Sequence, residues 1–159
     1  MIKKLFLVPL FIVVLASNGL TDILEGFEAL QKKDYKRALI EFKPLADKGD
    51  PIAQTNLGII YVEGYGVTKN YKMAVKWFEK ASAQRFAFAQ TLLGSMYENG
   101  YGVSKSLIRA YMWMDIAASF SDTNGKVLRD LIVLRLSSYE IEQGRKLVDE
   151  CIKKNFREC

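Results

Sequence analysis

One stretch of the chain occurs twice, and this repetition limits the folds it can adopt more than any other feature. Residues 57–67 read LGIIYVEGYGV, and residues 93–103 read LGSMYENGYGV. The match extends without a gap over residues 53–82 and 89–118, where about half of the positions are identical. A constant period of 36 residues is typical of helical repeat arrays, in which each unit packs only against its neighbours.

Each unit is predicted to be a pair of helices. The first helix of the first unit spans about 52–63, where apolar residues recur at helical spacing on one face. The second helix is expected to follow Asn70, which shares its position in the repeat with Asp34 and Ser106. The side-chain oxygen of each can accept a hydrogen bond from the first turn of a helix. Three helix starts in phase therefore extend the repeat upstream of the two clear units.

Both units carry a Gly-Tyr-Gly triplet after the predicted first helix. We interpret the first glycine as a left-handed C-cap residue and the second as a further tight bend, at Gly64, Gly66, Gly100 and Gly102. A phosphate-binding loop would need a preceding strand and the complete Gly-x4-Gly-Lys-Ser/Thr pattern, and neither is present. Trp77 and Trp113 occupy equivalent positions and are expected to fill the core where neighbouring helix pairs meet.

The shared pattern A-x3-LG-x2-Y-x2-G-x-GV-x6-A-x2-W-x3-A resembles Sel1-like repeats, a branch of the tetratricopeptide-type helical arrays. Residues 22–50 resemble the divergent unit that often opens such arrays. The resemblance implies an all-α fold, a right-handed α/α superhelix of antiparallel helix pairs whose first helices line a concave face. It also implies an adaptor role with a protein partner. We assign no cofactor.

The repeat stops after Ser119, and two further helices are predicted, over about 124–136 and from Ser137 onward. A solenoid needs a terminal cap, because the last repeat exposes the surface that a next neighbour would bury. We therefore divide the chain into a signal peptide, a divergent first hairpin, two Sel1-like repeats and a C-terminal helical cap, at residues 1–19, 20–50, 51–86, 87–121 and 122–159.

The first residues have the layout of a secretory signal peptide. Lys3 and Lys4 precede an apolar run over 5–15, and small residues follow at 16–19. We expect cleavage after Ala16 or Gly19, with no stable membrane insertion afterwards; an uncleaved anchor is the alternative. The predicted location is the periplasm or the outside of a bacterial cell.

The chain has two cysteines, Cys151 and Cys159. In an exported protein such an isolated pair favours a disulfide, which would fasten the last helix to the tail that follows it. Pairing between two molecules is the alternative.

The composition excludes several classes of chemistry. The chain has no histidine, so Ser-His-Asp and Cys-His catalytic arrangements cannot form. A net charge of +5, from 23 basic and 18 acidic residues, gives no case for nucleic-acid binding. We assign no catalytic residue and no metal site.

Candidate binding residues are first-helix positions that differ between the otherwise matched units. They are Asn56, Ile60, Glu63, Leu92, Met96 and Asn99. Such variation is expected of a binding groove, although drift on a solvent-exposed face gives the same pattern. Tyr65 and Tyr101 stand at the tips of the two glycine loops. They form either a contact ridge for a partner or a cover over the backbone of their own loops.

The leading hypothesis is an exported, non-enzymatic interaction module that binds a partner in its concave groove. The alternative is an envelope enzyme or binder acting on peptidoglycan or β-lactam-like ligands, as associated with some secreted Sel1-type proteins. That branch carries a cysteine pair in each repeat, which this chain lacks. A third hypothesis is a structural homodimer formed through an incompletely capped end.

Overall fold

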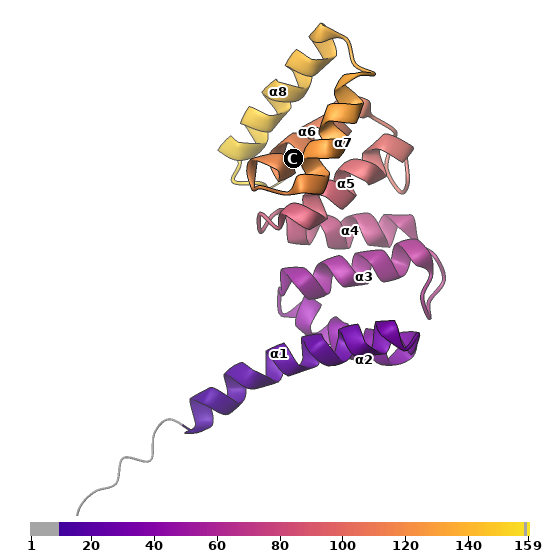
Figure 1. Cartoon of the computed structure of the whole chain (residues 1–159), viewed down its shortest axis with the longest axis vertical. Coiled ribbons are helices and arrows are strands. Elements are labelled where there is room, and N and C mark those ends of the chain that lie inside the picture. Colours follow the sequence, from indigo (N-terminus) through magenta and orange to yellow (C-terminus); the bar gives the residue numbers. More distant parts are fainter. Residues whose placement is uncertain (1–9, 158) are drawn as a thin grey trace, which may run out of the picture.

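The computed structural model describes residues 10–157 and residue 159. Within them the chain forms eight helices and no strand, which confirms the predicted all-α solenoid. The first six helices stack as three antiparallel pairs along the long axis of the molecule, and the last two both pack on the sixth (Figure 1). The helices are α1 (Leu10–Gln31), α2 (Tyr35–Asp47), α3 (Pro51–Glu63), α4 (Tyr71–Ser82), α5 (Ala87–Asn99), α6 (Leu107–Ser119), α7 (Thr123–Val133) and α8 (Ser138–Lys153).

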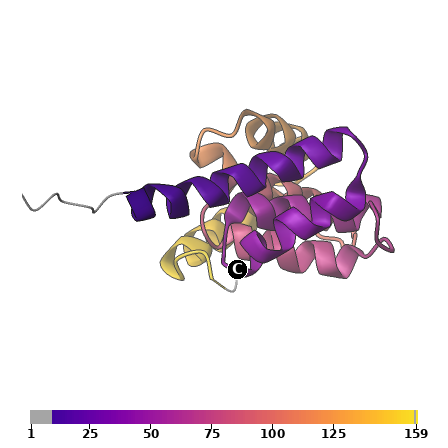
Figure 2. The same ribbon diagram turned by 90° about the horizontal axis from the view of Figure 1, so that it is seen from below.

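The predicted signal peptide lies partly outside the described residues. Residues 10–19 form the first turns of α1, which continues through Gln31 without a break. This helix projects well beyond the stack of the other helices (Figure 2). Within the described part of the chain, no helix combines the length and the apolar character that a membrane span requires.

The three predicted N-caps are confirmed, and each starts the second helix of a pair. Asp34 Oδ1 accepts from the main-chain N–H of Arg37 at 3.1 Å, and Asn70 Oδ1 accepts from that of Met73 at 3.0 Å. Ser106 Oγ accepts from the corresponding N–H three residues on, at 3.2 Å. These bonds satisfy amides that have no partner inside the helix, so the sequence sets where α2, α4 and α6 begin.

A glycine lets the two helices of a pair approach each other closely. A Cβ atom on Gly58 would lie 2.3 Å from Cε1 of Phe78, and one on Gly26 would lie 2.6 Å from Cε1 of Phe42. Both phenylalanines are completely buried. The pair α1–α2 therefore packs like the clear repeats, although its connection lacks the glycine loop.

The glycine loops join each pair of helices to the pair before it. Gly64 ends α3 in the left-handed conformation, with φ at 74°. Tyr65 stacks on Tyr35, the first residue of α2, with ring centroids 4.4 Å apart and planes 5° apart. Tyr101 stacks in the same way on Tyr71, the first residue of α4, at 4.6 Å and 8°. The two tyrosines thus contact the preceding helix pair.

The second glycine of each loop has a packing role beyond the predicted bend. A Cβ atom on Gly66 would lie 2.9 Å from Cβ of Tyr35, and one on Gly102 would lie 2.5 Å from the main-chain carbon of Tyr71. The loop therefore lies directly against the start of the preceding second helix, and a side chain there would force the two apart.

The tail after α8 folds back onto the stack. Cys151 and Cys159 form a disulfide within the chain. Phe156 is buried in the same cluster as Trp113. Arg85 Nη2 donates to Asn155 Oδ1 at 2.7 Å, and Arg109 Nη1 donates to the main-chain oxygen of Cys159 at 2.7 Å. The tail is therefore anchored at both ends.

The two tryptophans occupy equivalent positions in the repeats, but different side chains pack over their rings. Trp77 is buried beside α2 and α3, and the ammonium groups of Lys43 and Lys80 lie 5.7 and 4.2 Å from its ring centroid. Trp113 is buried one repeat further on, beneath Phe156. Both side chains are at most 5% exposed, as expected of residues at the junctions between helix pairs.

Replacing Gly102 with alanine should lower the free energy of unfolding by about 2–3 kcal/mol, because the new methyl group would meet main-chain atoms. Gly49→Ala is the matched control: its φ of 100° is at least as unfavourable, but nothing lies within 4 Å of its Cβ position. We expect the control to lose about 1 kcal/mol in chemical denaturation followed by circular dichroism. Equal losses for the two variants would contradict the close approach.

Replacing both cysteines with serine should lower the free energy of unfolding by about 2–3 kcal/mol, since the closed ring is short. Thermal denaturation with and without a reducing agent measures the loss. The reductant should destabilise the unmodified protein and leave the double variant unchanged. An unmodified protein insensitive to reduction would show that the tail contacts suffice without the bond.

Candidate protein-binding groove

A hollow of about 340 Å³ lies between α3 and α5, the first helices of two successive repeats. Phe78 of α4 contributes to its wall, and Tyr101 stands at its edge on the following loop. The lining residues are mostly apolar: Ile59, Val62, Glu63, Phe78, Leu92, Ser95, Met96, Asn99 and Tyr101. Such a concave apolar surface with a few polar groups suits an apolar side chain from a partner.

Five of the residues singled out from the sequence lie together at this hollow: Glu63, Leu92, Met96, Asn99 and Tyr101. Met96 is only 4% exposed and belongs to the wall rather than to the rim. Asn99 Nδ2 donates to the main-chain oxygen of Ser95 at 2.9 Å, which fixes its side chain along α5. Glu63 is exposed and makes no ion pair with any described residue.

The structure corrects the expectation for Ile60 and Asn56. Ile60 is completely buried, in one cluster with Leu57 and Trp77, and so cannot contact a partner. Asn56 is 8% exposed, and its Nδ2 donates to the main-chain oxygen of Ile52 at 2.8 Å. Ile60 lies three residues after Leu57, which places both on the buried face of the helix. Its difference from Met96 is therefore a change in core packing.

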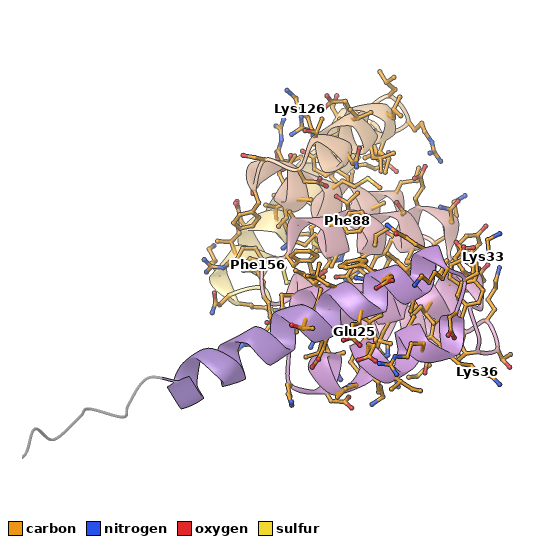
Figure 3. All side chains as sticks on the ribbon, turned by 60° about the horizontal axis from the view of Figure 1, so that its bottom comes forward. Glu25, Lys33, Lys36, Phe88, Lys126 and Phe156 are labelled. Atoms are coloured by element: carbon orange, nitrogen blue, oxygen red, sulfur yellow. A yellow bond between two sulfur atoms is a disulfide. The ribbon has the colours of Figure 1, made fainter. Side chains whose placement is uncertain are left out.

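Sequence reasoning missed Ile59 and Val62, which line the hollow. Each directly precedes a residue that was chosen, Ile60 or Glu63, and the two lie three residues apart on one side of α3. It also missed that this face continues beyond the hollow. Phe27 of α1 and Leu131 of α7 are exposed, at 38% and 54%. Phe27 aligns with Ile59 through the equivalent glycines Gly26 and Gly58, and Leu131 aligns with Ser95 at the 36-residue period. Phe88, which is 42% exposed, lies one turn before Leu92 (Figure 3).

We call this surface the first-helix face and define it by Phe27, Ile59, Val62, Phe88, Leu92 and Leu131. In a chain of which 26% of residues are charged, these six positions carry no charge. Near one end of the face, Arg135 pairs with Glu98. Glu63 stands at the hollow and has no ion-pair partner among the described residues. The face therefore offers apolar contact and one negative charge.

A second hollow, of about 330 Å³, lies beside Trp113 and the tail. Burial raises the pKa of Glu79 at its wall, although this side chain still reaches solvent. The other lining residues are Ala83, Tyr97, Trp113, Phe156 and Cys159, and the sulfur of Cys159 is held in the disulfide. Glu79 is thus the only carboxylate among the described lining residues. The described chain also contains no group of three or more residues able to hold a metal.

Adjacent isoleucines test which face of α3 is buried. Ile60→Ala should lower the free energy of unfolding by about 3 kcal/mol, because it leaves a cavity in the core. Ile59→Ala removes the same atoms from a partly exposed position, and we expect a loss of about 1 kcal/mol. Urea denaturation of both variants gives the comparison, and a larger loss for Ile59→Ala would contradict the assignment.

Comparison with known proteins agrees with this architecture. The Sel1 repeat family model matches residues 51–86 and 87–119. A protective antigen of uropathogenic Escherichia coli with an SLR fold superposes with a TM-score of 0.80 and 27% identity, over 87% of this chain and 31% of that one. A Sel1 repeat protein from Oxalobacter formigenes gives 0.66 and 33%, over 70% and 46%.

This chain thus spans about a third and just under half of the two solved relatives. A search of curated proteins gives no significant match. The chain thus contains two Sel1 repeats within residues 51–119, stacked as antiparallel helix pairs in an SLR fold.

Proposed function

We propose that this protein is an exported, non-enzymatic interaction module that binds an apolar segment of a partner protein on its first-helix face. The observation that carries the proposal is the apolar hollow between α3 and α5. Sel1 repeats are commonly protein-interaction modules, which agrees with this assignment.

The helices on either side of the hollow are held rigidly. The Gly58–Phe78 contact fixes α3 on α4, and the Tyr101–Tyr71 stack fixes the loop after α5 on the start of α4. A surface held in place before binding loses little conformational entropy when a partner arrives, so a small contact area can still bind specifically.

The dimensions and charge of the face suggest the chemistry of the partner segment. An extended peptide advances about 3.3 Å per residue. Apolar side chains several residues apart in such a peptide would therefore meet successive first helices. Because Glu63 is exposed and unpaired among described residues, a lysine or arginine beside the central apolar residue would complement it.

Export is the part of the proposal that rests on the N-terminal sequence and on the disulfide. Residues 1–19 have the composition of a signal peptide, and disulfides persist in oxidising compartments. The protective role of the Escherichia coli relative fits a protein that reaches the cell envelope or its surroundings. Mass determination of the mature protein from fractionated cells tests it. Recovery of full-length chain from the cytoplasm would contradict export.

Binding is tested by Leu92→Glu, which places a charge at the hollow. The probes are crosslinked partners captured in native envelopes by a photoreactive residue at position 59 and identified by mass spectrometry. Leu92→Glu should weaken their binding at least tenfold, because a carboxylate would be buried against Ile59 and Phe78.

The matched control is Ile40→Glu, which changes an apolar residue that is 64% exposed on α2. This variant should bind like the unmodified protein. Equal binding by all three proteins would exclude the first-helix face. Retention on peptidoglycan together with hydrolysis of a chromogenic β-lactam would replace the proposal with the envelope-enzyme alternative.

A further inference from the structure

The two tryptophans differ in the charged groups that lie beside their rings. The ring of Trp77 has two ammonium groups of the chain's own lysines beside it. Lys80 Nζ lies 4.2 Å from the ring centroid, and Lys43 Nζ lies 5.7 Å from it. Ammonium groups at such distances are attracted to the electron-rich face of an indole ring. The first tryptophan therefore shows that this position in the array can hold a cation.

The two equivalent places at Trp113 carry no cation. Thirty-six residues after Lys43 stands Glu79, and the same step from Lys80 leads to Ile116. Ile116 is 1% exposed and belongs to the core. Among the described residues, no lysine or arginine lies over the ring of Trp113. The second tryptophan therefore has a carboxylate nearby where the first has an ammonium group.

The tail after α8 completes the hollow beside Trp113. It brings Phe156, labelled in Figure 3, into the same cluster as the tryptophan, and Tyr97 of α5 also lines the hollow. The hollow has a volume of about 330 Å³. Because a water molecule occupies about 30 Å³ in the liquid, this space can hold a group of several heavy atoms. Three aromatic residues and one carboxylate around such a space are suited to an alkylammonium ion.

The carboxylate of Glu79 has no counter-ion close to it. It makes no ion pair with any described residue. Burial raises the pKa of Glu79, and the attraction of Lys76, which lowers this pKa, is the smaller effect. The side chain also reaches solvent, so a ligand can approach it from outside. A cation in the hollow would offset the partial desolvation of the carboxylate.

Two arginines already lie on the other aromatic rings of the hollow. Arg85 Cζ is 4.9 Å from the ring centroid of Phe156, and Arg109 Cζ is 5.7 Å from that of Tyr97. Neither arginine lines the hollow itself, and each donates a hydrogen bond to an oxygen atom of the tail. Their positive charge opposes the entry of a further cation, so binding in the hollow depends on the carboxylate of Glu79.

We propose that the hollow lined by Tyr97, Trp113, Phe156 and Glu79 binds an alkylammonium group, which contacts the indole ring and pairs with the carboxylate. The group belongs either to a free amine or quaternary ammonium compound, or to a lysine side chain of a partner. Both sources present a positively charged nitrogen on an alkyl chain. The site shares no lining residue with the α3–α5 hollow, so it does not depend on the proposed function.

The test is a titration of the isotopically labelled full chain, followed by nuclear magnetic resonance. The chain has two tryptophans and therefore two indole N–H signals, which Trp113→Phe assigns. Butylammonium and tetramethylammonium chloride should shift the Trp113 signal at millimolar concentrations. The Trp77 signal should stay in place, because two lysines already lie beside that ring. Sodium chloride and neutral n-butanol at equal concentrations are the controls and should shift neither signal.

Variants test the role of the carboxylate. Glu79→Gln should raise the dissociation constant of butylammonium at least tenfold, because the charge that pairs with the ligand is lost. Glu63→Gln is the matched control at the unpaired carboxylate of the other hollow, and it should bind like the unmodified protein. Glu79→Lys places a lysine where Lys43 stands in the preceding repeat and should abolish binding. Unchanged helical circular dichroism shows that each variant is folded.

A capped Gly-Gly-Lys-Gly-Gly peptide, compared with its norleucine analogue, separates the two sources of the ammonium group. If the lysine peptide binds at least as tightly as butylammonium, the site accepts a lysine side chain. If only the free ammonium compounds bind, the site takes small amines. Either result supports the proposal.

Four outcomes would overturn the proposal. They are the absence of any shift at Trp113, parallel shifts of both indole signals, equal shifts with n-butanol, and unchanged binding by Glu79→Gln. Leu92→Glu, which disrupts the first-helix face, should leave ammonium binding intact. This variant therefore distinguishes a failure of the ammonium site from a failure of the function proposed for the groove.

Discussion

The contact between each glycine loop and the preceding second helix sets the stride of the whole array. Gly66 and Gly102 lie where any Cβ would collide with the start of α2 or α4. The adjoining tyrosines stack on the residues that begin those helices. Because the same contact recurs after 36 residues, successive first helices are held at similar relative positions. The hollow between α3 and α5 exists because that spacing is fixed while its side chains vary.

Much of the fold could be predicted from interactions between residues close in sequence. The caps at Asp34, Asn70 and Ser106 act within three residues of sequence, so their register located the helix starts without knowledge of tertiary structure. The stacking of Tyr65 and Tyr101 on the preceding helix pair was not predicted, although Tyr35 and Tyr71 share one position in the repeat. The cysteine bond was expected from composition, but the anchoring of the tail by Arg85 and Arg109 depends on long-range folding.

The binding face was only partly predictable. Comparing the two repeats shows which positions differ in residue type. It does not show whether a side chain points into the core or to the surface. Ile60 and Met96 vary within the core, whereas Ile59 and Ser95 vary at the surface. Only the helical spacing from Leu57 separates these cases, and both isoleucines are equally apolar. Leu131 lay outside the recognised repeats and became visible as part of the first-helix face through the register of α7.

The residues exposed on α1, at one end of the stack, differ in chemistry from those exposed on α7, near the other. Every repeat must cover the face left by its neighbour, and α1 does this with paired charges that water can solvate. At α7 the places of Thr91 and Glu98 carry Val127 and Leu134, which are 53% and 82% exposed. Leu134, the C-cap of α7, shares its place in the repeat with Val62 of α3, so the apolar first-helix face continues along α7 instead of ending in paired charges.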